Sequence, residues 1–191
     1  QIASCKKGIL EMDKIISCYS LSTVNTYVSF INKNCTEIID KIIKKIPNST
    51  FSCKLDNNAV IKCKIKFNIN TKKLDIDFSK SSNLLLNNFN TPKSVTKSVV
   101  VYFLRTLVKE NIPLNEGVLK NINLIYSNES MLNPQYPAPV VAGNVETSQT
   151  LIDILNGAIS IQAACYGTMS NITFGDKNFG YYETICGGEG A

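Results

Sequence analysis

The chain has 191 residues, of which 44% are hydrophobic and 18% charged, and its formal net charge is +5. This composition supplies a sizeable core and excludes a disordered chain, and no apolar run approaches the roughly 18 residues of a membrane span. The sequence contains no His, which excludes His-based triads, His metal ligands and His acid–base chemistry.

The lysines and cysteines bear on partners and on location. Residues 1–73 are net basic and residues 74–191 net acidic, but the lysines are spread along the chain and Arg105 is its single Arg. We therefore expect a solvated basic face and no nucleic-acid site. The seven cysteines form no CxxC pair, so we expect reduced, mostly buried thiols, no disulfides and no metal site, as in a cytoplasmic protein.

Two helices are predicted at the start of the chain. Apolar residues recur at helical spacing over residues 8–19, and a longer stripe of the same kind covers residues 22–46. Ser22 or Thr23 can cap the second helix, and Pro47 stops it.

The pattern then changes to the period of two that indicates β-strands. Apolar side chains alternate with lysines over residues 61–67 and with lysine and aspartates over 73–78, and a turn-rich segment, 68–72, separates the two runs. With a strand at 50–55 this hairpin predicts a three-stranded meander, with one apolar and one charged face. Lys and Asp can pair across its strands.

Helical periodicity returns over residues 93–110 and 148–161, with a short strand predicted at 122–126 between them. The tail from residue 165 onward is rich in Gly, Asn, Tyr and Thr. Because helices and meander are segregated along the chain, the predicted class is α+β. It comprises long N-terminal helices, an antiparallel β meander, further helices and a Gly-rich C-terminal segment.

Residues 143–149, directly before the last predicted helix, combine Gly, Asn, Glu, Thr and Ser. Because a helix N-terminus offers unpaired N–H groups, this segment can bind a phosphate or carboxylate, with Asn144 and Glu146 as polar site residues. The alternative is an ordinary helix start in a polar loop, with Thr147 or Ser148 as the cap.

Three further features suggest chemistry more weakly. Residues 187–190, Gly-Gly-Glu-Gly, can cradle a phosphate but lack the Lys-Ser/Thr pair and the helix that complete a P-loop, and a flexible turn is the alternative. Glu146 and Glu183 can serve as acid and base only where the fold brings them together. Cys165 and Cys186 have no His to deprotonate them, which favours inert buried thiols.

Four ordered segments resemble the signature motifs of the hydantoinase B/5-oxoprolinase family. They are residues 112–119 (IPLNEGVL), 133–149 (NPQYPAPVVAGNVETSQ), 167–175 (GTMSNITFG) and 181–188 (YYETICGG). The resemblance covers essentially the whole chain. It leans toward the 5-oxoprolinase branch, because the segment 156–164 is short and the last motif is similar to that of the oxoprolinases.

This resemblance implies one partial hydantoinase B-like domain over residues 1–191, truncated at both ends. It implies a cytoplasmic, ATP-hydrolysing enzyme of glutathione metabolism that opens the lactam ring of 5-oxo-L-proline to L-glutamate. ATP would phosphorylate the amide carbonyl before water attacks it. A hydantoinase A-like domain or subunit outside this chain would bind ATP, any metal ligands of the family would also lie outside it, and the isolated chain would be inactive.

The same resemblance leaves other functions open. The chain can belong to an N-methylhydantoinase or a ketone carboxylase subunit, or it can be a non-catalytic remnant that docks a hydantoinase A-like partner. A homo- or hetero-oligomer is expected in each case. An adjoining acetate-kinase-like nucleotide domain in the same reading frame would favour the oxoprolinase.

The predicted site joins these motifs into one polar surface. Glu146 and Glu183 are the predicted catalytic residues, and Glu146 would orient water or a neighbouring donor. Asn144 would hold the lactam or its carboxylate. The predicted substrate-binding residues are Asn144, Thr147, Ser148, Gly167, Asn171, Gly187 and Gly188.

Overall fold

A computed structural model describes residues 1–113 and 115–187. Its elements in chain order are α1 (Ile2–Tyr19), α2 (Leu21–Ile43), β1 (Ser49–Lys54), β2 (Val60–Asn68), β3 (Lys73–Asp77), α3 (Lys93–Thr106), the 3₁₀ helix η1 (Glu116–Leu119), β4 (Ile122–Ile125), the 3₁₀ helix η2 (Val141–Gly143), α4 (Thr147–Ile159), β5 (Asn171–Gly175) and β6 (Gly180–Thr184). The predicted α+β class is confirmed.

Four strands form one sheet in the order β1-β2-β3-β4. The first three pair antiparallel, as the meander predicts, whereas β4 pairs parallel to β3 with Leu74 opposite Ile122. The sheet is therefore mixed, which corrects the expectation of a purely antiparallel meander. A parallel neighbour needs a crossover connection, and α3 with η1 lies in the segment that provides it.

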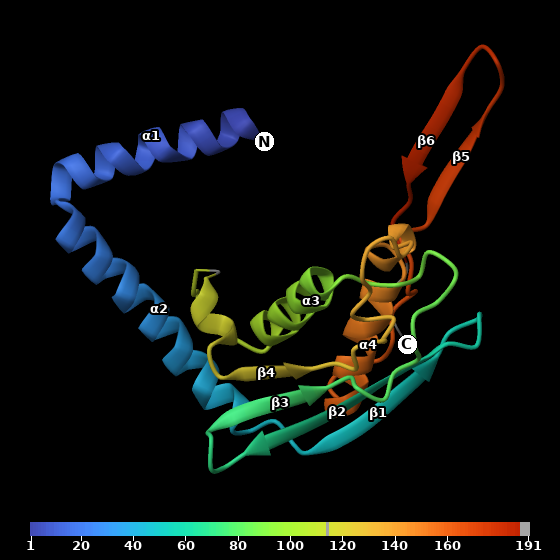
Figure 1. Cartoon of the computed structure of the whole chain (residues 1–191), viewed down its shortest axis with the longest axis horizontal. Coiled ribbons are helices and arrows are strands. Elements are labelled where there is room, and N and C mark those ends of the chain that lie inside the picture. The colour runs from blue at the N-terminus through green and yellow to red at the C-terminus, as the bar shows by residue number, and fades with distance from the viewer. Residues whose placement is uncertain (114, 188–191) are drawn as a thin grey trace.

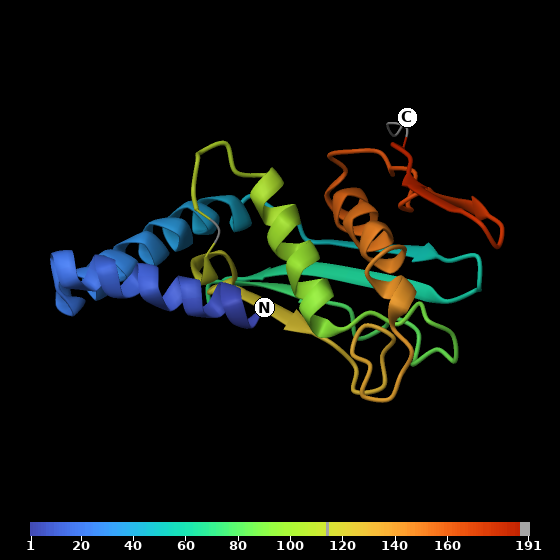
Figure 2. The same ribbon diagram turned by 90° about the horizontal axis from the view of Figure 1, so that it is seen from above.

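The core lies between the sheet and the helices α3 and α4, which cover the same face of it (Figures 1 and 2). Ile61, Cys63 and Ile65 of β2 point into this core and are buried, while the lysines between them are exposed. The register sets Lys64 opposite Asp77 and Lys66 opposite Asp75. Within the described part of the chain, however, neither pair approaches to ion-pair distance.

The first two helices form a V-shaped arm that leaves the body of the molecule (Figure 1). None of the residues of α1 is buried, and those buried in α2 lie in its second half, from Cys35 to Ile43. The cap of α2 is Ser20, which accepts a hydrogen bond from the Thr23 N–H. The prediction that Ser22 or Thr23 caps this helix is therefore wrong.

The Gly-rich tail contains a two-stranded hairpin, β5–β6, that projects from the body (Figure 1). All of its strand residues are exposed. The Phe174 ring stacks on Tyr181, with ring centroids 4.8 Å apart, and meets Phe179 edge to face. Aromatic contacts within the hairpin thus replace a core beneath it.

Two findings concern the location and chemistry of the chain. Across residues 1–113 and 115–187, no helix combines the length and the apolar character needed to cross a membrane. All seven cysteines are free thiols. Cys35 and Cys63 are buried, whereas Cys5, Cys18 and Cys186 are exposed, so the expectation of mostly buried thiols is wrong.

Candidate functional site

The segment that leads into α4 is built onto a buried asparagine, Asn90. The Asn90 side-chain amide donates to three carbonyl oxygens, those of Leu85, Asn87 and Pro139. Gly143 packs so closely on this residue that a Cβ added to it would lie 2.1 Å from the Asn90 carbonyl oxygen. Only glycine fits there, and this contact fixes where the polar residues before α4 begin.

The start of α4 differs from the predicted capped helix. The N-cap is Glu146, and its side chain makes no capping hydrogen bond. The Thr147 hydroxyl is buried and donates to the Phe89 carbonyl oxygen at 2.7 Å, and the Ser148 hydroxyl donates to the Asn144 carbonyl oxygen at 2.8 Å. Neither residue is the cap, because η2 leads directly into α4 and the Glu146 N–H already bonds to the Ala142 carbonyl oxygen.

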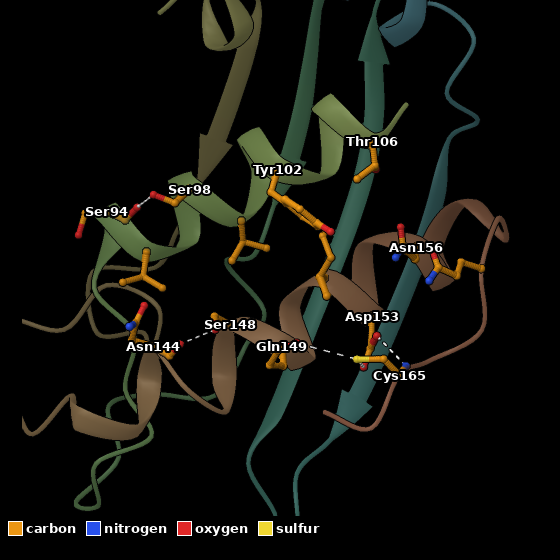
Figure 3. A pocket seen from close by; sticks show the side chains of 14 residues that line it. Ser94, Ser98, Tyr102, Thr106, Asn144, Ser148, Gln149, Asp153, Asn156 and Cys165 are labelled. Atoms are coloured by element: carbon orange, nitrogen blue, oxygen red, sulfur yellow. Dashed lines mark hydrogen bonds between the residues drawn. The ribbon is translucent and has the colours of Figure 1, made fainter. Parts of the chain in front are cut away.

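A polar groove of about 580 Å³ lies between α3 and α4 (Figure 3). We call it the α3–α4 groove. Hydroxyl, amide and carboxyl groups from both helices face it, together with one thiol. The polar residues are Ser94, Ser98, Tyr102, Thr106, Asn144, Ser148, Gln149, Asp153, Asn156, Gln162 and Cys165.

Asp153 is the one charged residue in the lining of this groove, which includes no Lys or Arg. Hydroxyl and amide groups can both donate and accept hydrogen bonds. The groove therefore suits a small, neutral, polar ligand such as an amide, and it lacks the cations that a triphosphate requires.

A second cavity, of about 780 Å³, lies between β1 and α4. We call it the β1–α4 cavity. Glu146, Gly167 and Thr168 line it, and the Thr168 hydroxyl donates a short hydrogen bond to the Glu146 carboxylate. Asp153 lines this cavity as well as the α3–α4 groove, so the two spaces adjoin at that residue.

The loop of residues 161–168 is held to α4 at two points. Asp153 accepts a hydrogen bond from the Cys165 N–H at 3.0 Å, and the Cys165 sulfur lies 3.6 Å from the second oxygen of the same carboxylate. Glu146 holds Thr168. These two carboxylates are seven residues apart, about two helical turns, so they face the loop together.

Cys165 is a poor nucleophile in this position. Burial raises the pKa of its thiol above the ordinary value, and the neighbouring Asp153 carboxylate raises it further. A raised pKa reduces the fraction of reactive thiolate. The thiol is thus suited to donating a weak hydrogen bond, in line with the expected absence of cysteine catalysis.

The residues of the predicted site lie in three places. Asn144 and Ser148 line the α3–α4 groove, and Glu146 and Gly167 line the β1–α4 cavity. Thr147 is buried beneath them. Their assigned roles in binding and catalysis stay predictions.

The remaining predicted residues belong to the hairpin and the tail. Asn171 accepts hydrogen bonds from the hydroxyls of Tyr182 and Thr184, and Glu183 accepts one from Tyr181. The linings of the α3–α4 groove and the β1–α4 cavity do not include Glu183 or Asn171, so the structure does not pair Glu183 with Glu146. Gly187 lies beside Tyr166. Gly188 and the rest of the predicted phosphate-cradling turn fall outside the described residues.

Sequence reasoning missed the contribution of α3 to the groove. Ser94, Ser98 and Tyr102 reach it from a helix some fifty residues earlier in the chain. One signal was present, since Asp153 is the single charged residue in the sequence of α4. Among the residues described, no cluster of three or more Cys, Asp or Glu side chains is arranged to hold a metal ion.

The fold has a known counterpart. The chain superposes on the ATP-dependent caprolactamase from Pseudomonas jessenii with a TM-score of 0.77, over 96% of this chain and 34% of that one. The two sequences are 17% identical. The likeness is therefore one of fold, and it includes the arm and the body together.

The sequence identifies the family. The sequence model of Hydantoinase B/oxoprolinase matches residues 1–191. The chain is 37% identical to the 5-oxoprolinase of Dictyostelium discoideum and 35% identical to 5-oxoprolinase 1 of Arabidopsis thaliana, in both cases over its whole length. It is 25% identical, over 95% of its length, to the B-type chain of a putative D-/L-hydantoinase from Pseudomonas sp.. The chain belongs to the hydantoinase B/oxoprolinase family.

The chain is short beside these relatives. It spans 16% of the length of the two 5-oxoprolinases and 34% of the putative hydantoinase chain.

Proposed function

We propose that this chain is part of a cytoplasmic, ATP-dependent 5-oxoprolinase that opens 5-oxo-L-proline to L-glutamate, a reaction of glutathione metabolism. The observation that carries the proposal is the identity of 35% and 37% over the whole chain to proteins named 5-oxoprolinase. The identity to the putative hydantoinase is lower, at 25%. A hydantoin-hydrolysing activity is therefore the second candidate.

The α3–α4 groove supports this proposal through its chemistry. A lactam ring presents one C=O acceptor and one N–H donor, and the groove offers matching neutral groups, among them the Tyr102 hydroxyl and the Asn144 amide. Its volume of about 580 Å³ exceeds what a five-membered ring needs and lies in the usual range for small-molecule sites. In this proposal Asn144 orients the amide.

ATP belongs elsewhere in the longer protein. The lining of the α3–α4 groove has one carboxylate and no cation to neutralise a triphosphate. In the proposal ATP is held by a hydantoinase A-like domain or subunit, and when bound it supplies the phosphoryl group that activates the amide carbonyl. Glu146, which holds the Thr168 hydroxyl, would position that hydroxyl and the attacking water, and Glu183 stays the second predicted carboxylate.

Residues 1–191 are, in the same proposal, one part of a larger hydantoinase B-like domain. α1 and the β5–β6 hairpin expose large apolar side chains, such as Ile9 at 62% and Tyr182 at 65%, and exposed apolar patches mark surfaces that another part covers. The purified 191-residue chain is expected to bind a hydrophobic dye. A monomeric, sharply melting chain that binds none would contradict this assignment.

The test of the reaction uses the full-length protein that contains this chain. With 5-oxo-L-proline and ATP it is expected to release ADP and to form L-glutamate in parallel amounts. Turnover of N-methylhydantoin without turnover of 5-oxoproline would instead support the hydantoinase. No turnover of either compound would support a non-catalytic remnant.

Two variants test the residues before α4. Asn144→Ala and Glu146→Ala are each expected to lower turnover about 100-fold, near 2.7 kcal/mol of transition-state stabilisation. Asn70→Ala and Glu110→Ala change exposed residues outside both cavities and serve as matched controls. Unchanged turnover in the first pair, with folding monitored separately, would assign these residues a purely structural role.

A further inference from the structure

A third cavity, of about 740 Å³, lies between α3 and η1. We call it the α3–η1 cavity. It shares Ser98 and Tyr102 with the α3–α4 groove and otherwise has a different lining. The motifs that define the predicted site contribute nothing to it except Asn115, Glu116 and Leu119 of the 112–119 segment.

The charge of this cavity is the opposite of that in the groove. Lys97, Arg105 and Lys120 line it, against one carboxylate, that of Glu116. In the part of the chain that the structure describes, none of these three cations takes part in an ion pair, because the ion pairs there all lie within α1 and α2. The cavity therefore carries an excess of positive charge with no protein counter-ion.

Arg105 is the strongest sign that a counter-ion is missing. It is the single Arg of the sequence and is half-buried at the wall of the cavity. One of its terminal nitrogens, Nη1, is buried and has no hydrogen-bond partner among the described residues. A guanidinium nitrogen buried without a partner is costly, and an anion in the cavity would supply the missing opposite charge.

The rest of the lining indicates the size and kind of anion. Val101 and Leu119 make part of the wall apolar, and the exposed Lys97 and Lys120 flank it. We propose that the α3–η1 cavity is a binding site for a small oxyanion, either a carboxylate or a phosphate, held by Arg105, Lys97 and Lys120. This site is separate from the α3–α4 groove and does not depend on the reaction proposed above.

The proposal predicts that bound anion protects two lysines from acylation. Full-length protein is treated with an amine-acylating reagent, with and without inorganic phosphate in one arm and L-glutamate in the other. Mass spectrometry then gives the acylation rate at each lysine. Lys97 and Lys120 are expected to react severalfold more slowly with the anion that binds, whereas Lys109, which is exposed and outside the cavity, keeps its rate. The two arms show whether the oxyanion is a phosphate or a carboxylate.

Variants connect this protection to the cavity. Arg105→Met is expected to raise the anion concentration for half-protection of Lys97 roughly tenfold or more, because a hydrogen bond to a charged group is lost. Lys120→Met, at an exposed position that leaves the fold intact, is expected to raise it by a smaller factor. Lys109→Met removes the same charge outside the cavity and is expected to leave it unchanged.

Two results would overturn the site. One is an equal acylation rate at Lys97 and Lys120 with and without either anion. The other is protection that persists unchanged in both Arg105→Met and Lys120→Met. Because Lys120→Met does not depend on the half-buried arginine, it decides the question even where Arg105→Met fails to fold.

Discussion

The body and the arm carry the same kind of helical pattern with opposite outcomes. In α4, Leu151 and Leu155 are fully buried, whereas Ile9 and Met12 of α1 are 62% and 47% exposed. Helical spacing of apolar residues therefore predicts a helix in both regions but does not say whether anything covers it. Because burial of apolar surface drives folding, the stability of the chain comes from the body.

The two regions also differ in what holds them together. The ion pairs of the described residues are Lys7–Glu11, Lys14–Glu11 and Lys33–Glu37, and all lie within α1 or α2. Exposed pairs of this kind add little to stability. The body instead holds a continuous cluster of buried apolar side chains from α2, the sheet, α3 and α4.

The largest expected effect is a loss of core packing. Phe103 is fully buried in α3, and Phe103→Ala is expected to lower the free energy of unfolding by about 3–5 kcal/mol. Ile9→Ala in α1 is expected to change it by less than about 0.5 kcal/mol. Urea unfolding of the 191-residue chain measures both, and similar losses would mean that the arm is packed in solution.

Two glycines give a comparison in which the sign itself differs. Gly143→Ala places a methyl group against the Asn90 carbonyl oxygen and is expected to destabilise the chain by about 1–3 kcal/mol. A Cβ at Gly8 in α1 meets nothing within 4 Å, so Gly8→Ala is expected to stabilise that helix by about 0.5–1 kcal/mol. Thermal unfolding followed by circular dichroism tests both, and a stable Gly143→Ala variant would refute the close packing described at η2.

The cysteines extend the comparison to reactivity. At pH 8, the exposed Cys18 of α1 is expected to react first with a thiol reagent and Cys165 more slowly. Cys63 is expected to react only on unfolding, because burial raises the pKa of its thiol to about 12. Asp153→Asn is expected to speed the reaction of Cys165 a few-fold, since it removes a negative charge that raises the pKa of this thiol.

Cys18 is the internal control for that experiment, because it lies far from Asp153 in the chain and its rate is expected to stay constant. Mass spectrometry after timed labelling gives the rate for each cysteine. A Cys165 rate that does not change in Asp153→Asn would show that the carboxylate does not govern this thiol.

The smallest effect concerns the pH dependence of α1. Hydrogen bonds from Lys7 and Lys14 lower the pKa of the Glu11 carboxyl below its ordinary value. A carboxyl with a lowered pKa contributes stability above its unfolded-state pKa and loses that contribution as the pH falls through the folded-state value. The helicity of α1 is therefore expected to decrease slightly in acid. Glu11→Gln removes this dependence, and NMR chemical shifts of α1 residues report both.

Local pattern was enough to predict most elements of the fold. Alternation over residues 61–67 and 73–78 located β2 and β3 and their register, because neighbouring strands joined by a short turn have few other ways to pair. The pairing of β4 was not predictable in the same way. It joins Leu74 to Ile122, and nothing local in either segment specifies a partner so distant in the chain.

The site was predictable to a smaller degree. The motif before α4 gave Asn144 and Ser148, which line the α3–α4 groove. Glu146 lies in a different cavity because the turn from η2 into α4 directs successive side chains to different sides of the helix. The contribution of Tyr102 depends on how α3 packs beside α4, and a single sequence contains no direct record of that packing.

The parallel pairing of β3 with β4 has a consequence for the order in which the chain folds. The meander β1–β2–β3 requires only short loops to close, whereas β4 can join it only after the segment that contains α3 and η1 has folded back over the sheet. Closing a long loop costs more chain entropy, and contacts distant in sequence slow folding. We therefore expect the meander to be structured early in the folding transition state and β4 to dock late, together with α3, so that mutations in β4 mainly accelerate unfolding.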